Sequence, residues 1–368
     1  MRIIYLINGL NGGGAAFPMV RVIDLMRDLG HEVRVIALMP QDGKAAVRLV
    51  RAGIPYEVIG TDVYDFFAPA VRLARRLRTL EPHLIWTSLT RGTIYGQLIG
   101  RWLRIPVVSW QHSAFLKRGN VAILRRTLRL TSRWVADSDA VNAFARAVLG
   151  VAPDKISTWS PFVADTAAPV AEAWNGVGAL CLGTLGRLHY SKQYDVLLRA
   201  FARARQLDEM LRGHLQLHIA GEGPEREDLQ ALARKLDLQS CVTFAGFVVQ
   251  PGPFLAGLHG YVQTSMKEGF CIAAHEAMLA GLPVISTRVG ELAYSVRPGR
   301  TGWLCDVGDV EAIARAMVAL ARDPAEAARM GANARAMVLD RYSSARFRTA
   351  GRAVLERIER EVLPCEAP

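Results

Sequence analysis

The chain has 368 residues, of which 51% are hydrophobic and 21% charged; this is the composition of a folded protein of about two domains and not of a disordered chain. Its five cysteines are odd in number and form no C-x-x-C pair, which argues against a disulfide framework or a structural zinc site and fits a reducing cytoplasm. The net charge of +11 is uneven, because residues 1–165 hold 22 Lys and Arg against 12 Asp and Glu. This basic first half favours nucleic acid, anionic lipid or phosphorylated ligands as partners.

The first half of the chain alternates apolar runs with helical stretches. Residues 2–7 have the pattern of a buried strand, residues 8–14 form a glycine-rich loop, and the helical stretch that follows ends at Gly30. Further strands are expected at residues 33–38, 56–59, 84–87, 107–110 and 134–137. This alternation predicts a parallel sheet with helices on both faces.

The second half repeats this organisation after a connection. Residues 153–178 are punctuated by proline and lose their periodicity, so we interpret them as an interdomain connection. Strands are then expected at residues 179–185, 215–220, 242–245, 260–263 and 283–286, and residues 325–362 are almost wholly helical. Two doubly wound domains would place a ligand at the carboxyl ends of their strands, in a cleft between the halves.

No membrane span or secretory signal is expected from the sequence. The longest uncharged stretch, residues 241–266, is interrupted by glycine and proline and cannot form one apolar helix. The apolar run at residues 3–7 is too short for a signal peptide and meets the glycine-rich loop at once. We therefore expect a soluble, cytoplasmic protein.

Two carboxylates mark the most informative segment, residues 265–284. Seven residues separate Glu268 from Glu276, in a pattern that predicts a strand end, a glycine turn and a helix N-terminus. Amides at a helix start can bind a phosphate, and a carboxylate within the helix can accept hydrogen bonds from the vicinal hydroxyls of a ribose. The amides expected near the ligand belong to Gly269, Phe270, Cys271 and Ile272.

Three other segments follow predicted strands and carry candidate ligand groups. Arg187 and Lys192 flank a turn after the strand at 179–185, as two cations that grip a diphosphate should. Gly12 and Gly13 allow close backbone approach to a ligand, with a merely flexible turn as the alternative. His112 lies just past the strand at 107–110 and is expected to face the cleft, with a half-buried structural histidine as the alternative.

The motifs form an ordered series along nearly the whole chain. The series consists of Gly12-Gly13, Gly186-Arg187-Leu188 with Lys192, Gly221-Glu222-Gly223-Pro224, Phe244-Ala245-Gly246, the Glu268 and Glu276 pair, and Gly281-Leu282-Pro283-Val284. This series resembles that of the retaining glycosyltransferases of family 4. The resemblance implies the α/β GT-B fold, in which two facing Rossmann-like, doubly wound domains enclose a cleft. It implies an acceptor-side domain at residues 1–163, a nucleotide-sugar-binding domain at 164–340, and a terminal segment, 341–368, whose helix crosses back to the first domain.

The resemblance also implies a role for each motif. Arg187 and Lys192 would neutralise the diphosphate of a UDP- or GDP-linked sugar, and Glu276 would bind its ribose. Glu268 and His112 would hydrogen-bond the donor sugar. The glycines that would approach the phosphate or sugar are Gly12, Gly13 and Gly221. No metal or other cofactor is expected, because the cations replace a metal, and the leaving phosphate oxygen would accept the acceptor's proton on a front-face, retaining route.

Basic and apolar side chains interleave along residues 117–133. The basic members are Lys117, Arg118, Arg125, Arg126, Arg129 and Arg133, and a second cluster comprises Arg72, Arg75, Arg76 and Arg78. This pattern is typical of a surface that contacts an anionic membrane, although a solvated helix face gives the same pattern. Nucleic acid is not expected, because the chain lacks a recognisable reading motif.

These inferences combine into one leading hypothesis. We expect a peripheral glycosyltransferase at the inner face of the plasma membrane, which moves a sugar to a lipid-linked or oligosaccharide acceptor in surface polysaccharide or glycolipid synthesis. One alternative is a non-catalytic basic binding protein on a GT-B scaffold, against which the intact charged motifs argue. The other is a GT-B phosphorylase or sugar-nucleotide epimerase, which turnover without a sugar acceptor would favour.

Overall fold

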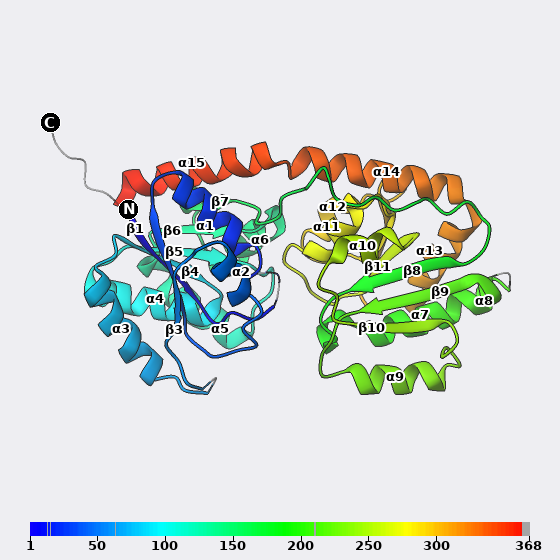
Figure 1. Ribbon diagram of the computed structural model, residues 1–368, viewed down its shortest axis with the longest axis horizontal. Helices are drawn as coiled ribbons and strands as arrows, with labels where there is room; N and C mark the ends of the chain where they lie inside the picture. Colours follow the sequence, from blue (N-terminus) through cyan, green and yellow to red (C-terminus); the bar gives the residue numbers. More distant parts are fainter. Residues whose placement is uncertain (13, 15, 63, 210, 363–368) are drawn as a thin grey trace. The chain divides into compact units, whose positions relative to one another are not determined.

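The computed structural model describes residues 1–12, 14, 16–62, 64–209 and 211–362, and the chain divides into two compact units (Figure 1). Unit 1 consists of Met1–Val163 together with Ala345–Pro368, and unit 2 consists of Ala164–Ser344. Unit 1 is therefore discontinuous in sequence, because its last helix comes from the far end of the chain.

Unit 1 contains a seven-stranded sheet in which all neighbouring strands are parallel, in the order β3-β2-β1-β4-β5-β6-β7. The strands are β1 (Arg2–Ile7), β2 (Glu32–Ala37), β3 (Tyr56–Val58), β4 (Leu84–Ser88), β5 (Val107–Gln111), β6 (Arg133–Ala136) and β7 (Ile156–Thr158). The helices are α1 (Met19–Asp28), α2 (Ala46–Arg51), α3 (Ala68–Leu80), α4 (Thr90–Leu103), α5 (Arg118–Thr127), α6 (Asp139–Phe144) and α15 (Ser344–Val362). The apolar runs of β4 and β5 are buried along their whole length, as expected for strands covered on both faces.

Unit 2 repeats this topology with a six-stranded parallel sheet, in the order β10-β9-β8-β11-β12-β13. The strands are β8 (Leu180–Leu185), β9 (Leu215–Ala220), β10 (Val242–Gly246), β11 (Gly260–Gln263), β12 (Val284–Thr287) and β13 (Gly302–Cys305). The helices are α7 (Tyr194–Leu207), α8 (Leu211–His214), α9 (Arg226–Lys235), α10 (Pro251–Ala256), α11 (Ile272–Leu279), α12 (Leu292–Ser295), α13 (Val310–Arg322) and α14 (Pro324–Arg341). The strand order reverses between β8 and β11, as it does between β1 and β4 in unit 1, and ligands bind at the carboxyl ends of strands beside such a reversal.

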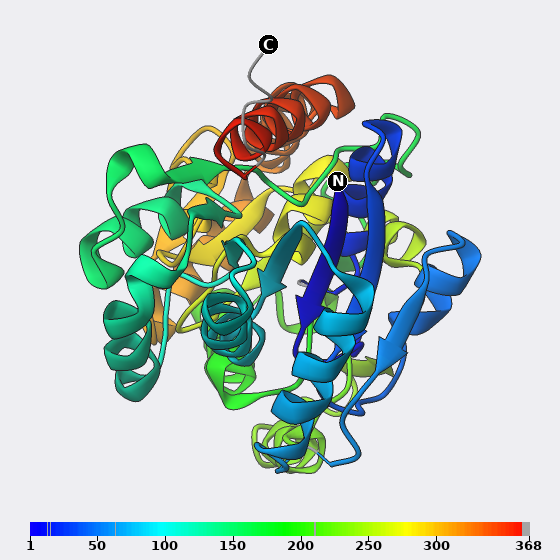
Figure 2. The same cartoon turned by 90° about the vertical axis from the view of Figure 1, so that its left-hand side faces the viewer.

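Helix α15 completes the core of unit 1. Its residues Phe347, Leu355 and Ile358 are buried among side chains of β1, β2 and α1. Gly351, in the middle of the helix, leaves no room for a side chain, because a Cβ there would lie 2.4 Å from the indole of Trp159. Figures 1 and 2 both show α15 in red beside the N-terminal end of β1.

The prediction of two doubly wound parallel sheets is confirmed, but two strands were missed. β7 lies inside the stretch that was predicted to be an irregular connection, and β13 lies in a stretch where no strand was expected. Each is an edge strand of only three or four residues. Runs this short carry too few residues for a periodicity to stand out beside neighbouring proline and glycine.

Candidate functional site

The charged motifs of unit 2 lie where its strand order reverses. Arg187 and Lys192 follow β8, and Glu268 follows the adjacent strand β11. The two loops are joined directly, because the Met266 amide donates a hydrogen bond to the Ser191 carbonyl at 2.9 Å. Segments far apart in sequence therefore form one piece of local structure.

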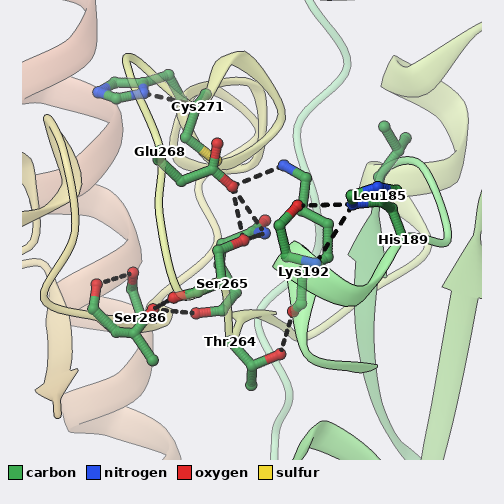
Figure 3. A network of polar contacts seen from close by, with 12 residues as sticks. Leu185, His189, Lys192, Thr264, Ser265, Glu268, Cys271 and Ser286 are labelled. Carbon is green, nitrogen blue, oxygen red and sulfur yellow. Dashed lines mark hydrogen bonds and ion pairs between the residues drawn. The ribbon is translucent and has the colours of Figure 1, made fainter. Parts of the chain in front are cut away.

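Glu268 is at the centre of this junction (Figure 3). Its oxygen Oε1 accepts hydrogen bonds from Lys192 Nζ at 2.6 Å, Ser265 Oγ at 2.6 Å and Gln263 Nε2 at 3.4 Å. The Tyr261 hydroxyl donates in turn to Gln263 at 2.9 Å. The side chains of Glu268 and Lys192 are 10% and 22% exposed. Three donors on one oxygen fix the carboxylate, so both charged groups are oriented before a ligand arrives.

The electrostatics of this pair keep Lys192 charged. Burial by itself would lower the pKa of Lys192, but the Glu268 carboxylate outweighs that effect and holds the pKa well above its ordinary value. An ion pair kept partly out of water contributes little net stability, whereas it provides a fixed cation for an anionic ligand. The arrangement therefore has the character of a binding site more than of a structural brace.

Helix α11 starts immediately after this loop, as predicted. Gly269 and Phe270 lead into it, and Ile272 is its first residue, so the amides of its first turn have no acceptor inside the helix. Cys271 has φ +65°, in the left-handed region that favours glycine. Burial raises the pKa of its thiol to about 12, so Cys271 is neutral at pH 7 and is not a nucleophile. Gly290 backs the loop closely, because a Cβ there would lie 2.5 Å from the Gly269 carbonyl oxygen.

His275 anchors α11 from within the core. Its Nδ1 lies 3.0 Å from the Cys271 carbonyl oxygen, and its Nε2 lies 2.9 Å from the Ser295 hydroxyl. The ring stacks on Phe270 with centroids 4.1 Å apart, and Tyr342 meets it edge-on at 5.3 Å. Burial lowers the pKa of His275 to about 4, so the neutral ring donates from Nδ1 and accepts at Nε2. His275 is therefore a packing residue beneath the loop.

The remaining predicted residues of unit 2 have different surroundings. Arg187 is exposed, and Glu276 is half-buried in the second turn of α11. Gly221 has φ +137°, and a Cβ there would lie 1.9 Å from the Gly186 carbonyl oxygen. Its amide donates to the Gly246 carbonyl at 2.7 Å. The need for glycine at 221 therefore comes from the close packing of the ends of β8, β9 and β10.

In unit 1, the glycine loop gives little support for direct ligand contact. The Gly12 amide donates to Asp42 Oδ1 at 3.0 Å, so this donor is already used within the protein. Gly13 lies outside the described residues.

His112 lies at the carboxyl end of β5, as predicted, but both of its ring nitrogens are occupied. Nε2 is 2.6 Å from Ser88 Oγ, and Nδ1 is 3.0 Å from each carboxylate oxygen of Asp137. Ser88 is the last residue of β4 and Asp137 directly follows β6, on either side of β5 in the sheet. Neither Ser88 nor Asp137 was predicted to belong to the site, although both are polar residues at the ends of adjacent parallel strands.

Five of the six basic side chains that the sequence places in residues 117–133 are exposed. Lys117, Arg118, Arg125, Arg126 and Arg129 are exposed. The inclusion of Arg133 is wrong, because this residue lies in β6 and is 2% exposed. Its guanidinium donates to Glu361 of α15 at 2.5 Å and to the Asp154 carbonyl at 2.5 Å.

Within the described part of the chain, no helix combines the length and the apolar character needed to cross a bilayer.

The side chains that could ligate metals or form disulfides are scattered. Four cysteines are free thiols, and the fifth, Cys365, lies outside the described residues. Across the described ranges, His, Cys, Asp and Glu side chains form no group of three or more that could hold a metal ion.

Comparisons with known proteins point to one family. The family model "Glycosyltransferase Family 4" matches residues 12–166, and the model "Glycosyl transferases group 1" matches residues 178–337. A D-inositol 3-phosphate glycosyltransferase of Kribbella flavida is 30% identical over 87% of this chain and 85% of its own length. The lipopolysaccharide core biosynthesis glycosyltransferase LpsE of Rhizobium meliloti is 34% identical over 38% of this chain, and the match spans only 39% of that relative's length.

A solved structure shows the same fold. Anabaena HepE in complex with UDP-glucose superposes with a TM-score of 0.84 at 20% identity, over 97% of this chain and 100% of that chain.

Proposed function

The chain belongs to glycosyltransferase family 4 and has the GT-B fold, and from this premise we propose that it transfers a sugar from a nucleoside-diphosphate sugar to a saccharide acceptor. The observation that carries the proposal is the fixed Lys192–Glu268 pair at the strand-order reversal of unit 2, directly before the start of α11. The matched segment 178–337 contains this whole site. Because the Anabaena relative of the fold was solved with UDP-glucose, a UDP-linked sugar is the first donor to test.

The proposed roles follow from charge and position. Arg187, which is exposed, and Lys192, which is held by Glu268, neutralise the diphosphate. Glu276 in the second turn of α11 accepts hydrogen bonds from the ribose hydroxyls, and the positive end of the same helix favours the phosphates. Negative charge grows on the diphosphate as the sugar leaves, and preorganised cations stabilise that charge without reorganising.

The reaction needs no redox step. The bond between the anomeric carbon and the diphosphate oxygen breaks, an acceptor hydroxyl oxygen bonds to the same carbon, and its proton passes to the leaving phosphate oxygen. Attack on the face that the leaving group vacates retains the anomeric configuration. The two cations do the work of a metal in this scheme, so transfer proceeds in the presence of a chelator.

Ligand-induced stabilisation tests the donor site. We would record thermal unfolding of the purified protein with UDP, GDP and ADP in turn, in the presence of EDTA. A ligand at 100 times its dissociation constant stabilises the protein by about 2.7 kcal/mol, which raises the unfolding midpoint by several degrees. We expect one nucleotide to produce this shift and Glu276→Ala to lose it.

The matched control is Glu227→Ala, which removes an exposed carboxylate from α9 in the same unit and should keep the full shift. Absence of a shift with all three nucleotides would overturn the proposal in favour of a non-catalytic scaffold. A shift followed by turnover that requires inorganic phosphate in place of a sugar acceptor would favour a phosphorylase.

The proposed acceptor is lipid-linked, and unit 1 meets an anionic membrane at the cytoplasmic face, where the product enters surface polysaccharide or glycolipid synthesis. Residues 66–136 hold 13 Lys and Arg against a single acidic residue, Glu81. Trp102 of α4 is 61% exposed, and the guanidinium of Arg78 of α3 stacks over it at 4.3 Å from the ring centroid. Basic residues among exposed aromatic side chains are typical of surfaces that bind the interface of an anionic bilayer.

Vesicle sedimentation tests the membrane contact. Each basic residue near an anionic surface contributes about 1 kcal/mol, so Arg125→Glu with Arg126→Glu should weaken binding to phosphatidylglycerol vesicles at least about 30-fold. The matched control makes the same charge change in unit 2, at Arg234 and Lys235 of α9, and should bind like the parent. Equal binding of the two double variants to phosphatidylglycerol vesicles would contradict the proposed surface. So would equal binding of the parent to phosphatidylcholine and phosphatidylglycerol vesicles.

A further inference from the structure

A chain of buried polar groups crosses the carboxyl edge of the unit 1 sheet. Ser88 Oγ lies 2.6 Å from His112 Nε2, and His112 Nδ1 lies 3.0 Å from both carboxylate oxygens of Asp137. The side chains of His112 and Asp137 are 8% and 5% exposed, and Ser88 is 0% exposed.

In the neutral form of His112, the Asp137 carboxylate determines which ring nitrogen carries the proton. A carboxylate only accepts, so the proton of the neutral imidazole lies on Nδ1, opposite Asp137. His112 Nε2 then carries a lone pair, and the Ser88 hydroxyl must donate to it. The protons of Ser88 and His112 therefore both point towards Asp137.

The imidazole is also held in its plane. It stacks on Trp110 with ring centroids 5.3 Å apart and an interplanar angle of 23°. Trp110 is itself buried, 1% exposed, and stacks on Trp159 at 5.4 Å. Rotation of the His112 ring would break this stacking as well as both hydrogen bonds, whereas the Ser88 hydroxyl can turn away by a change of one side-chain torsion.

We propose that Asp137 is a positioning residue for sugar transfer: it holds His112 in the tautomer whose Nε2 accepts a hydrogen bond from a substrate hydroxyl, and Ser88 occupies that acceptor while the site is empty. The inference rests on the proposed function, because it states that His112 accepts, and the substrate donates, the hydrogen bond between them. A substrate hydroxyl replaces the Ser88 hydroxyl at Nε2, and a group that can only accept hydrogen bonds does not. Selection for a hydroxyl at this point of the substrate follows from the tautomer that Asp137 enforces.

Variants of the full chain test this assignment. The assay is release of the nucleoside diphosphate from UDP-glucose, or from the GDP- or ADP-linked sugar if the nucleotide panel selects that base. Asp137→Ala should lower kcat at least 10-fold and leave the affinity for the nucleoside diphosphate unchanged. Asp137→Asn should recover part of kcat, because its amide oxygen can still accept from Nδ1. The matched control, Asp154→Asn, changes an exposed carboxylate of the same unit and should behave like the parent.

Ser88→Ala gives a readout that a purely structural role would not produce. Removing the competing hydroxyl leaves Nε2 unpaired in the empty protein, so KM for the sugar donor should fall about threefold or more. Provided that His112→Ala has a lowered kcat, either of two results would overturn the inference. One is a rise in KM for Ser88→Ala, and the other is a parent-like kcat for both Asp137 variants. A parent-like kcat for His112→Ala itself would instead refute the role of His112 in the proposed function. Nucleotide-induced stabilisation, measured for each variant, shows whether it is folded.

Discussion

The buried imidazole of His275 should make unit 2 sensitive to mild acid. Its pKa is lowered to about 4 in the folded protein, against an ordinary value of 6.5. Between these values the unfolded chain takes up a proton that the folded protein excludes. The free energy of unfolding therefore falls as the pH drops below 6.5, and it stops falling on account of His275 only near pH 4. From pH 7 to pH 5, linkage gives a loss of about 2 kcal/mol in the free energy of unfolding.

A comparison of the parent with His275→Gln isolates the contribution of His275 to the pH dependence of the free energy of unfolding. Glutamine has no proton to titrate in this range, and its amide can donate to the Cys271 carbonyl as the imidazole does. We would measure urea denaturation by far-UV circular dichroism at pH 7 and pH 5 for both proteins. Other histidines with a lowered pKa are unchanged in the variant and cancel in the difference; they are His31, His218 and His259.

We expect the parent to lose about 2 kcal/mol more than His275→Gln between the two pH values. The variant is expected to be less stable than the parent at pH 7, because its packing on Phe270 is poorer, and this offset does not affect the difference. An equal pH dependence in the two proteins would refute the reasoning, since it would mean that the imidazole is protonated in the folded state or that it is reached by water.

Two backbone and packing features give further predictions, each measured by urea denaturation. Gly221→Ala should lower the free energy of unfolding several times more than Gly178→Ala, because both sites have positive φ but only Gly178 has open space around its Cβ position. Gly178→Ala should lower it by about 1 kcal/mol. Equal losses for the two variants would show that the ends of β8, β9 and β10 can separate. Arg133→Met should cost about 2 kcal/mol through the lost hydrogen bonds to Glu361 and to backbone. Arg129→Met, at an exposed arginine, should change stability by less than about 0.5 kcal/mol; a similar cost for both arginines would contradict the burial argument.

The fold was predictable from the sequence because its signals are local. Long apolar runs followed by helical periods identify central strands such as β1 and β8, and the alternation alone fixes the parallel topology. The edge strands β7 and β13 were not predictable in this way, because what makes them strands is the neighbour to which they pair. Pairing is a long-range property that a short run of residues does not encode.

The site was predictable to the level of motifs but not of partners. The position of Lys192 and Glu268 after adjacent strands could be anticipated, whereas their direct 2.6 Å contact depends on how two loops from different parts of the chain meet. Arg133 shows the opposite case, because its place in a basic run suggested exposure while its place in β6 buries it. Ser88 and Asp137 carry no motif at all, and only the order of strands in the sheet brings them to His112.

The discontinuity of unit 1 also bears on how the protein is made. Synthesis runs from the N-terminus, so all of residues 164–343 leave the ribosome before α15 does. Unit 2 can therefore reach its complete structure while unit 1, although translated first, still lacks Phe347, Leu355 and Ile358 from its core. The usual order, in which the N-terminal domain is finished first, is inverted in this chain. Until α15 has emerged, the nascent unit 1 exposes the apolar surface that α15 later covers.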